Sequence, residues 1–114
     1  MNERTKMFLD EYQMKALETA VYSPEYKIVY PTLGLSGEAG EVADKVKKVL
    51  RDNGGAFTDE KKEEIMKELG DVLWYVAVLA EDLGYSLEYV ARANNEKLAS
   101  RKERGKISGS GDER

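Results

Sequence analysis

Residues 35–49, LSGEAGEVADKVKKV, and residues 65–83, IMKELGDVLWYVAVLAEDL, carry the same apolar pattern. In both stretches apolar side chains recur at alternating steps of four and three residues. The first stretch has this spacing at Leu35, Ala39, Val42, Val46 and Val49, and the second has it at Ile65, Leu69, Val72, Val76, Leu79 and Leu83. Such a pattern forms one apolar stripe along a helix, and the stripe normally packs against another helix. The sequence therefore predicts two long helices that pack together.

Capping and helix-breaking residues complete an all-α prediction. Thr32, Thr58 and Ser86 are placed to cap helices, and Asn53-Gly54-Gly55 ends one. The predicted helices cover about residues 3–21, 33–51, 59–83 and 87–104, with a connector over residues 22–31. Because the link between the two central helices is short, we expect them to be antiparallel.

The expected architecture is a four-helix bundle that oligomerisation completes. Trp74 and Val78 lie away from the apolar stripe of their helix, so this helix needs apolar partners on several sides. A chain of 114 residues has room for one core. We therefore predict a single domain over residues 1–104. Residues 105–114 are rich in Gly, Ser and charge, and we predict that this tail is disordered.

Composition excludes several classes of function. The net charge of −4 argues against a protein that binds nucleic-acid phosphates. No apolar stretch approaches the ~20 residues of a membrane span, and no secretory signal opens the sequence. We therefore expect no nucleic-acid or membrane partner and a cytoplasmic location. With no Cys and no His, metal chemistry falls to oxygen ligands, which select hard cations such as Mg²⁺ or Mn²⁺.

Two acidic pairs share one sequence template. Glu38 and Glu41 are spaced i, i+3, as are Glu68 and Asp71, and each pair lies on the same-handed flank of its own apolar stripe. In an antiparallel packing the two flanks face the same side and lie level. Four carboxylates that close resist joint ionisation, and a divalent cation relieves the conflict. The alternative is that these acids are ordinary solvated helix faces.

These residues resemble the MazG-like all-α nucleoside triphosphate pyrophosphohydrolases, which are related to dimeric dUTPases and phosphoribosyl-ATP pyrophosphohydrolase. The likeness lies in LSGEAGEV at 35–42 and ELGDVLW at 68–74, and it covers about residues 5–105. The resemblance implies that water attacks a nucleoside triphosphate with Mg²⁺ present and releases pyrophosphate and a nucleoside monophosphate. It implies four metal ligands and a homodimer or homotetramer. It also implies catalytic roles for Glu38 and Glu41, one of which orients the water.

Further residues are candidates for substrate binding. Asn94, Lys97 and Arg101 match the family's N-x-x-K-x-x-x-R pattern for phosphate binding, although they also suit a basic surface near a helix C-terminus. Lys45 and Tyr75 lie on the acidic flanks. Trp74 points elsewhere and is expected at an interface. Two other functions stay open: a phosphoribosyl-ATP-type hydrolase, and a helical oligomerisation or regulatory module without activity.

Overall fold

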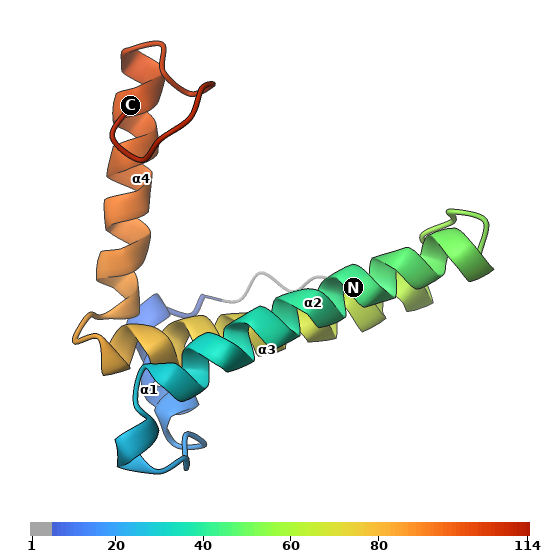
Figure 1. The fold of residues 1–114 in the computed structure, drawn as a ribbon, viewed down its shortest axis with the longest axis horizontal. Helices are drawn as coiled ribbons and strands as arrows, with labels where there is room; N and C mark the ends of the chain where they lie inside the picture. The colour runs from blue at the N-terminus through green and yellow to red at the C-terminus, as the bar shows by residue number, and fades with distance from the viewer. Residues whose placement is uncertain (1–5) are drawn as a thin grey trace.

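The computed structural model describes residues 6–114, and within this range the protein is all-α with no strands. Its elements are α1 (Leu9–Leu17), the 3₁₀ helix η1 (Pro24–Tyr26), α2 (Val29–Asp52), α3 (Asp59–Asp82) and α4 (Leu87–Glu103). Figure 1 shows that α2 and α3 lie side by side and that α4 turns away from them.

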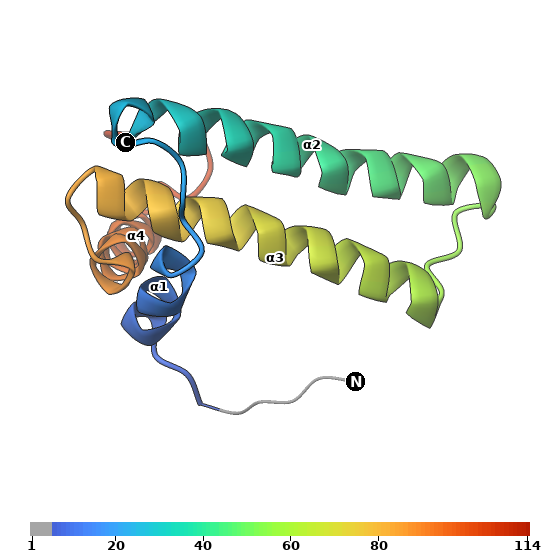
Figure 2. The same ribbon diagram turned by 90° about the horizontal axis from the view of Figure 1, so that it is seen from below.

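The central pair confirms the main prediction from sequence. α2 and α3 run in opposite directions and make the most extensive contact between any two elements (Figure 2). The link between them turns through Gly54 and Gly55, whose φ values of 60° and 80° suit glycine, and the Gly55 N–H donates to the carbonyl of Val49. The two helices therefore pair as predicted, although Leu69 and Leu83 of the predicted α3 stripe stay exposed in the single chain.

The caps of the last two helices are also confirmed. The Thr58 hydroxyl accepts a hydrogen bond from the Lys61 N–H, and the Ser86 hydroxyl accepts one from the Tyr89 N–H. Each cap satisfies a backbone donor that has no partner inside its helix. The starts of α3 and α4 therefore follow from local sequence.

Helices α1 and α2 differ from the prediction in their bounds. Helix α1 is shorter than residues 3–21, because after Leu17 the chain closes 3₁₀-type bonds and turns away; residues 3–5 lie outside the described range. Helix α2 begins at Val29, not after Thr32. Pro31 does not prevent this, because it lies in the first turn, where a missing N–H breaks no helical bond.

A small core joins α1 to α3 and the start of α4. It is built from Ala16, Ala77, Val78 and Leu87. The buried amide of Gln13 donates to the carbonyls of Ala77 and Tyr85 and accepts from the Leu87 N–H. Figure 2 shows α1 on the side of α3 away from α2. The core thus ties three elements to one end of the α2–α3 pair.

The chain on its own is open in shape. It exposes 8808 Å², whereas a compact monomer of its 12.8 kDa exposes about 6,300 Å². Its radius of gyration is 16.8 Å, against about 13 Å for a compact chain of this length. An apolar cavity of about 660 Å³ lies in the elbow between α3 and α4. No helix of the described residues has the length and apolar character of a membrane span.

The last ten residues fold back along the end of α4 without forming a helix (Figure 1). The Arg114 guanidinium donates to the carbonyls of Lys106, Ile107 and Gly111. The disorder predicted for residues 105–114 concerns motion in solution and stays a prediction, as does the domain boundary at residue 104.

Candidate functional site

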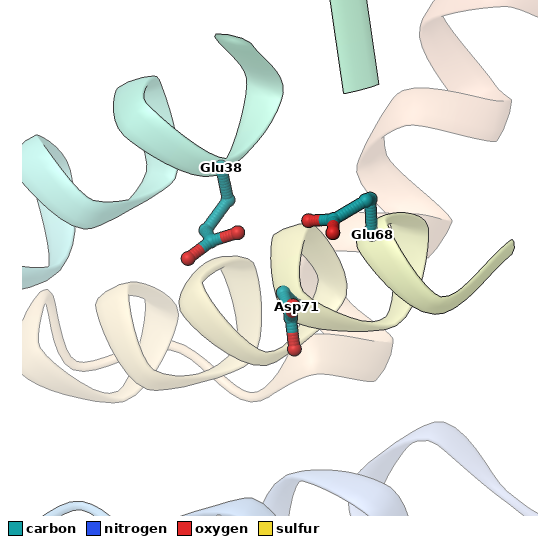
Figure 3. Close-up of side chains that lie close together, drawn as sticks. All are labelled: Glu38, Glu68 and Asp71. Carbon is teal, nitrogen blue, oxygen red and sulfur yellow. The ribbon is translucent and has the colours of Figure 1, made fainter. Parts of the chain in front are cut away.

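Three carboxylates meet where α2 and α3 face each other. Glu38 comes from α2, Glu68 and Asp71 come from α3, and each offers one oxygen that lies within 4.8 Å of the other two. Figure 3 shows the Glu38 and Glu68 side chains pointing toward one another, with Asp71 one turn along α3. The antiparallel packing of two equivalent flanks produces this group, as the sequence pattern predicts.

Glu41, the fourth predicted ligand, lies outside this group. It is exposed, one turn along α2 from Glu38, and its carboxylate does not join the three others. The structure therefore brings together three of the four predicted acids and leaves the fourth beside them.

Charge is uncompensated in this group. The pKa of Glu38 is raised above its usual 4.5 by partial burial and by the negative charges of Asp71, Glu68 and Glu41. None of the ion pairs in residues 6–114 involves any of the four acids. A cluster of oxygen donors that no protein cation neutralises fits a hard divalent cation.

Two tyrosines border the acidic group. Burial raises the pKa of Tyr75, and Tyr30, Glu38 and Asp71 raise it further. Burial and the charge of Asp71 raise the pKa of Tyr12. Both phenols therefore stay protonated at neutral pH, and the charge of Asp71 contributes to the raised pKa of each. Tyr75 lies where its position on the acidic flank predicts, and Tyr12 brings α1 to the same site.

Lys45 lies about two helical turns beyond Glu38 along α2. Its Nζ is 3.8 Å from a carboxylate oxygen of Glu64, across the α2–α3 contact. Both side chains are partly exposed, so this pair is weak and its lysine can change partner. Trp74 packs partly on the core that includes Ala16 of α1, and its Nε1–H donates to the Thr19 hydroxyl at 2.9 Å. The interface expected for it stays a prediction.

The predicted phosphate-binding residues of α4 do not reach the acidic group of their own chain. Asn94 and Lys97 line the elbow cavity together with Leu73. Leu73 is about 200° around α3 from Asp71, so the elbow opens on another face of that helix. Arg101 is 5% exposed, and its Nη2 donates to the carbonyl of Asp112 in the tail.

Comparison with known proteins decides the family. Residues 31–105 match the MazG nucleotide pyrophosphohydrolase domain. The chain belongs to the MazG family. The matched range begins with the first turn of α2 and includes the acidic group and all of α4.

Two relatives extend the likeness of this MazG protein. The Gene 37 protein of Mycobacterium phage L5 is 49% identical over an alignment of 114 positions. The alignment covers 95% of this chain and all of the phage protein. The uncharacterized protein YvdC of Bacillus subtilis (strain 168) is 40% identical over 72 residues, 59% of this chain and 68% of that protein. No solved structure matches the chain.

The geometry of this MazG domain suits hydrolysis of a phosphoric anhydride. Three clustered carboxylates can hold a divalent cation that keeps open positions for phosphate oxygens and water. Glu41, exposed and one turn away, is free to act on a water or to join the ligand set. Tyr30 lies in α2, although the sequence predicts a connector over residues 22–31. The i, i+4, i+8 spacing of Tyr30, Gly34 and Glu38 indicates that the three share one helix face.

Proposed function

We propose that the protein is a Mg²⁺-dependent nucleoside triphosphate pyrophosphohydrolase that maintains nucleotide pools. Water attack breaks the anhydride bond between the α- and β-phosphates, so that a (d)NTP and water yield a (d)NMP and pyrophosphate. The observation that carries the proposal is the group of Glu38, Glu68 and Asp71, with oxygens within 4.8 Å of one another, inside a MazG domain.

Each acid has a proposed role. Glu38, Glu68 and Asp71 hold the cation, and Glu41 joins them or orients the attacking water through a change of side-chain torsion. A Mg²⁺ or Mn²⁺ ion held by these residues would neutralise charge on the phosphate oxygens and lower the pKa of a bound water. Burial and three acidic neighbours raise the pKa of Glu38, and a cation bound at this group would counter that shift.

In this scheme Lys45 and Tyr75 contact the substrate. Lys45 exchanges Glu64 for a phosphate oxygen, and Tyr75 forms a wall beside the acids. The lysine is partly exposed, with 34% of its side chain accessible, so it can reach a ligand without first leaving the core.

We further propose that a second copy of the chain completes the site in a homodimer or homotetramer. The chain exposes about 2,500 Å² more than a compact monomer of its mass. For two chains this excess amounts to about 5,000 Å², which lies within the range of total area that obligate homodimers bury. Met66, Leu69 and Leu73 form an exposed apolar stripe on the elbow side of α3. Asn94 and Lys97 would then contact phosphates at the partner's acids, since they do not reach their own.

A substrate panel tests the activity directly. The protein is assayed with Mg²⁺ against the common ribo- and deoxyribonucleoside triphosphates, dUTP, oxidised bases and phosphoribosyl-ATP, with products resolved by chromatography. We expect a nucleoside monophosphate and pyrophosphate. Asp71→Asn and Glu41→Gln should lower kcat/KM by about 100-fold or more, while Glu63→Gln, an exposed acid on the same helix, should not.

The other results lead elsewhere. Turnover of phosphoribosyl-ATP alone would assign the protein to that related activity. No turnover of any anhydride would leave a helical oligomerisation or regulatory module and remove the proposed function.

A further inference from the structure

The face of the α2–α3 pair that carries the acids has two chemically different ends. On α2, Tyr30, Gly34 and Glu38 share one face by i, i+4, i+8 spacing, and Lys45 continues the same face beyond Glu38. On α3, Asp71, Tyr75 and Asp82 likewise share a face. Because the two helices are antiparallel, both aromatic positions lie on one side of the acids and the lysine lies on the other.

The aromatic end is a continuous row of rings. The Tyr22 and Tyr30 rings are stacked, with centroids 4.8 Å apart and planes 17° from parallel. Tyr30 and Tyr75 are 6.5 Å apart and tilted by 43°. Tyr75 packs directly on the backbone of Gly34, where a Cβ would overlap its ring. Tyr30 is 46% exposed, so part of this row is open to a ligand.

A strained turn brings Tyr30 to this place. Ile28, just before α2, has a φ of 68°, which is unfavourable for a β-branched residue. The carboxylate of Asp82 holds the turn by accepting hydrogen bonds from the Ile28 N–H at 2.9 Å and from the Tyr22 hydroxyl at 2.6 Å. Such strain persists only where surrounding contacts impose it, and it is common at ligand-binding sites. Here its result is that α2 starts early enough to carry Tyr30 at its second position.

We propose that Tyr30, supported by Tyr75, is the surface on which the nucleobase stacks, so that the nucleotide lies along this face of the α2–α3 pair with its base toward Tyr30 and its pyrophosphate toward Lys45. This inference rests on the proposed function, since it takes the phosphates to be held at the acids. Gly34 and Tyr30 lie one and two turns from Glu38, about 6 and 12 Å along α2. A ribose bridges a span of this order between the α-phosphate and the base.

The chemistry of the two ends supports this direction. A tyrosine ring stacks on any base, because every base has a π face, and it gives affinity with little discrimination. Lys45 and Lys61, both near Glu64, place positive charge at the other end, where pyrophosphate leaves. Asp82 acts as a positioning residue in this arrangement, because it touches Tyr22 and Ile28 and not the substrate.

Binding measurements with two probes test the proposal. One probe is a nucleoside triphosphate with a non-hydrolysable α,β-methylene bridge, and the other is inorganic tripolyphosphate, which has no base; both are titrated in Mg²⁺ by calorimetry. Loss of one stacked base costs about tenfold or more in affinity. We expect Tyr30→Leu, which keeps apolar bulk against Tyr22, and Tyr30→Ala to weaken the nucleotide analogue by about this factor and tripolyphosphate by less than twofold. Tyr26→Ala, at an exposed tyrosine outside the row, should bind both probes like the unmodified chain.

The outcomes separate this inference from the proposed function. Equal weakening of both probes by Tyr30→Leu, an unchanged affinity for the analogue, or no binding of the analogue to the unmodified chain would overturn the base platform. If Tyr30 contributes to binding of the analogue but the chain turns over no triphosphate, the platform stands and the hydrolase proposal fails.

Discussion

At the scale of single residues, one glycine of α2 is required because an aromatic ring packs against its backbone. Gly34, Gly37 and Gly40 all lie inside one helix, where each costs up to ~1 kcal/mol relative to alanine. One reason to keep glycine inside a helix is a need for close approach by another group. The structure meets it only at Gly34, which lies against the Tyr75 ring; Gly37 and Gly40 have open space around them.

Gly34→Ala should therefore destabilise the protein, although alanine is the better helix former. Its methyl group forces the Tyr75 ring to move, which costs about 1–3 kcal/mol in a packed site. Thermal unfolding should show a lower Tm, and kcat/KM on the best triphosphate should fall because the ring borders the acids. Gly37→Ala is the matched control and should raise the Tm slightly. Equal effects of the two substitutions would show that Tyr75 does not depend on the missing Cβ.

At the scale of elements, local signals predicted what local contacts determine. The caps at Thr58 and Ser86 and the paired apolar stripes were sufficient for α3, for the start of α4 and for the co-facing acids. The start of α2 differs from the prediction because Asp82, 54 residues away, accepts a hydrogen bond from the Ile28 N–H. The local sequence around Ile28 does not indicate such a long-range contact. Helical geometry places the Cβ of Glu41 beside the acidic group, but helical geometry does not fix side-chain torsions. The carboxylate of Glu41 therefore lies outside the group that the sequence predicts.

Asp82→Asn should loosen the start of α2. Both donors bond the same carboxylate oxygen, Oδ2, so the amide oxygen of asparagine can still accept from them but carries no charge. Hydrogen bonds to a charged group contribute about 1.5–3 kcal/mol each, and neutral ones about 0.5–1.5 kcal/mol. We expect a lower Tm together with a raised KM for nucleoside triphosphates and a nearly unchanged kcat, since the acids stay in place. Glu81→Gln, an exposed neighbour, is the control. A fall in kcat at constant KM would contradict the positioning role.

At the scale of the whole molecule, an L-shaped chain separates two halves of one predicted site. The acids lie on the α2–α3 pair, while Asn94 and Lys97 lie in the elbow on another face of α3. Sequence spacing could place each half on its helix but not relate the halves in space, because the direction of α4 depends on the core around Leu87. We propose that a second copy of the chain unites them.

Leu73→Glu should therefore yield a monomer and remove activity together. The substitution puts a charge into the apolar elbow, and light scattering after gel filtration reports the mass. Val21→Glu, at an exposed apolar residue of the connector, should change neither. Mixing Asp71→Asn with Lys97→Ala should restore part of the activity, because each mixed dimer contains one intact site. An active monomer, or no restoration from the mixture, would refute a shared site.

The central claim is that acidic edges of two antiparallel helices enclose one cation, and Mn²⁺ binding followed by electron paramagnetic resonance tests it without any turnover. We predict that the unmodified chain and Glu63→Gln bind Mn²⁺ alike and that Asp71→Asn and Glu38→Gln bind it at least about tenfold more weakly. Equal Mn²⁺ affinity in all four proteins would contradict the claim.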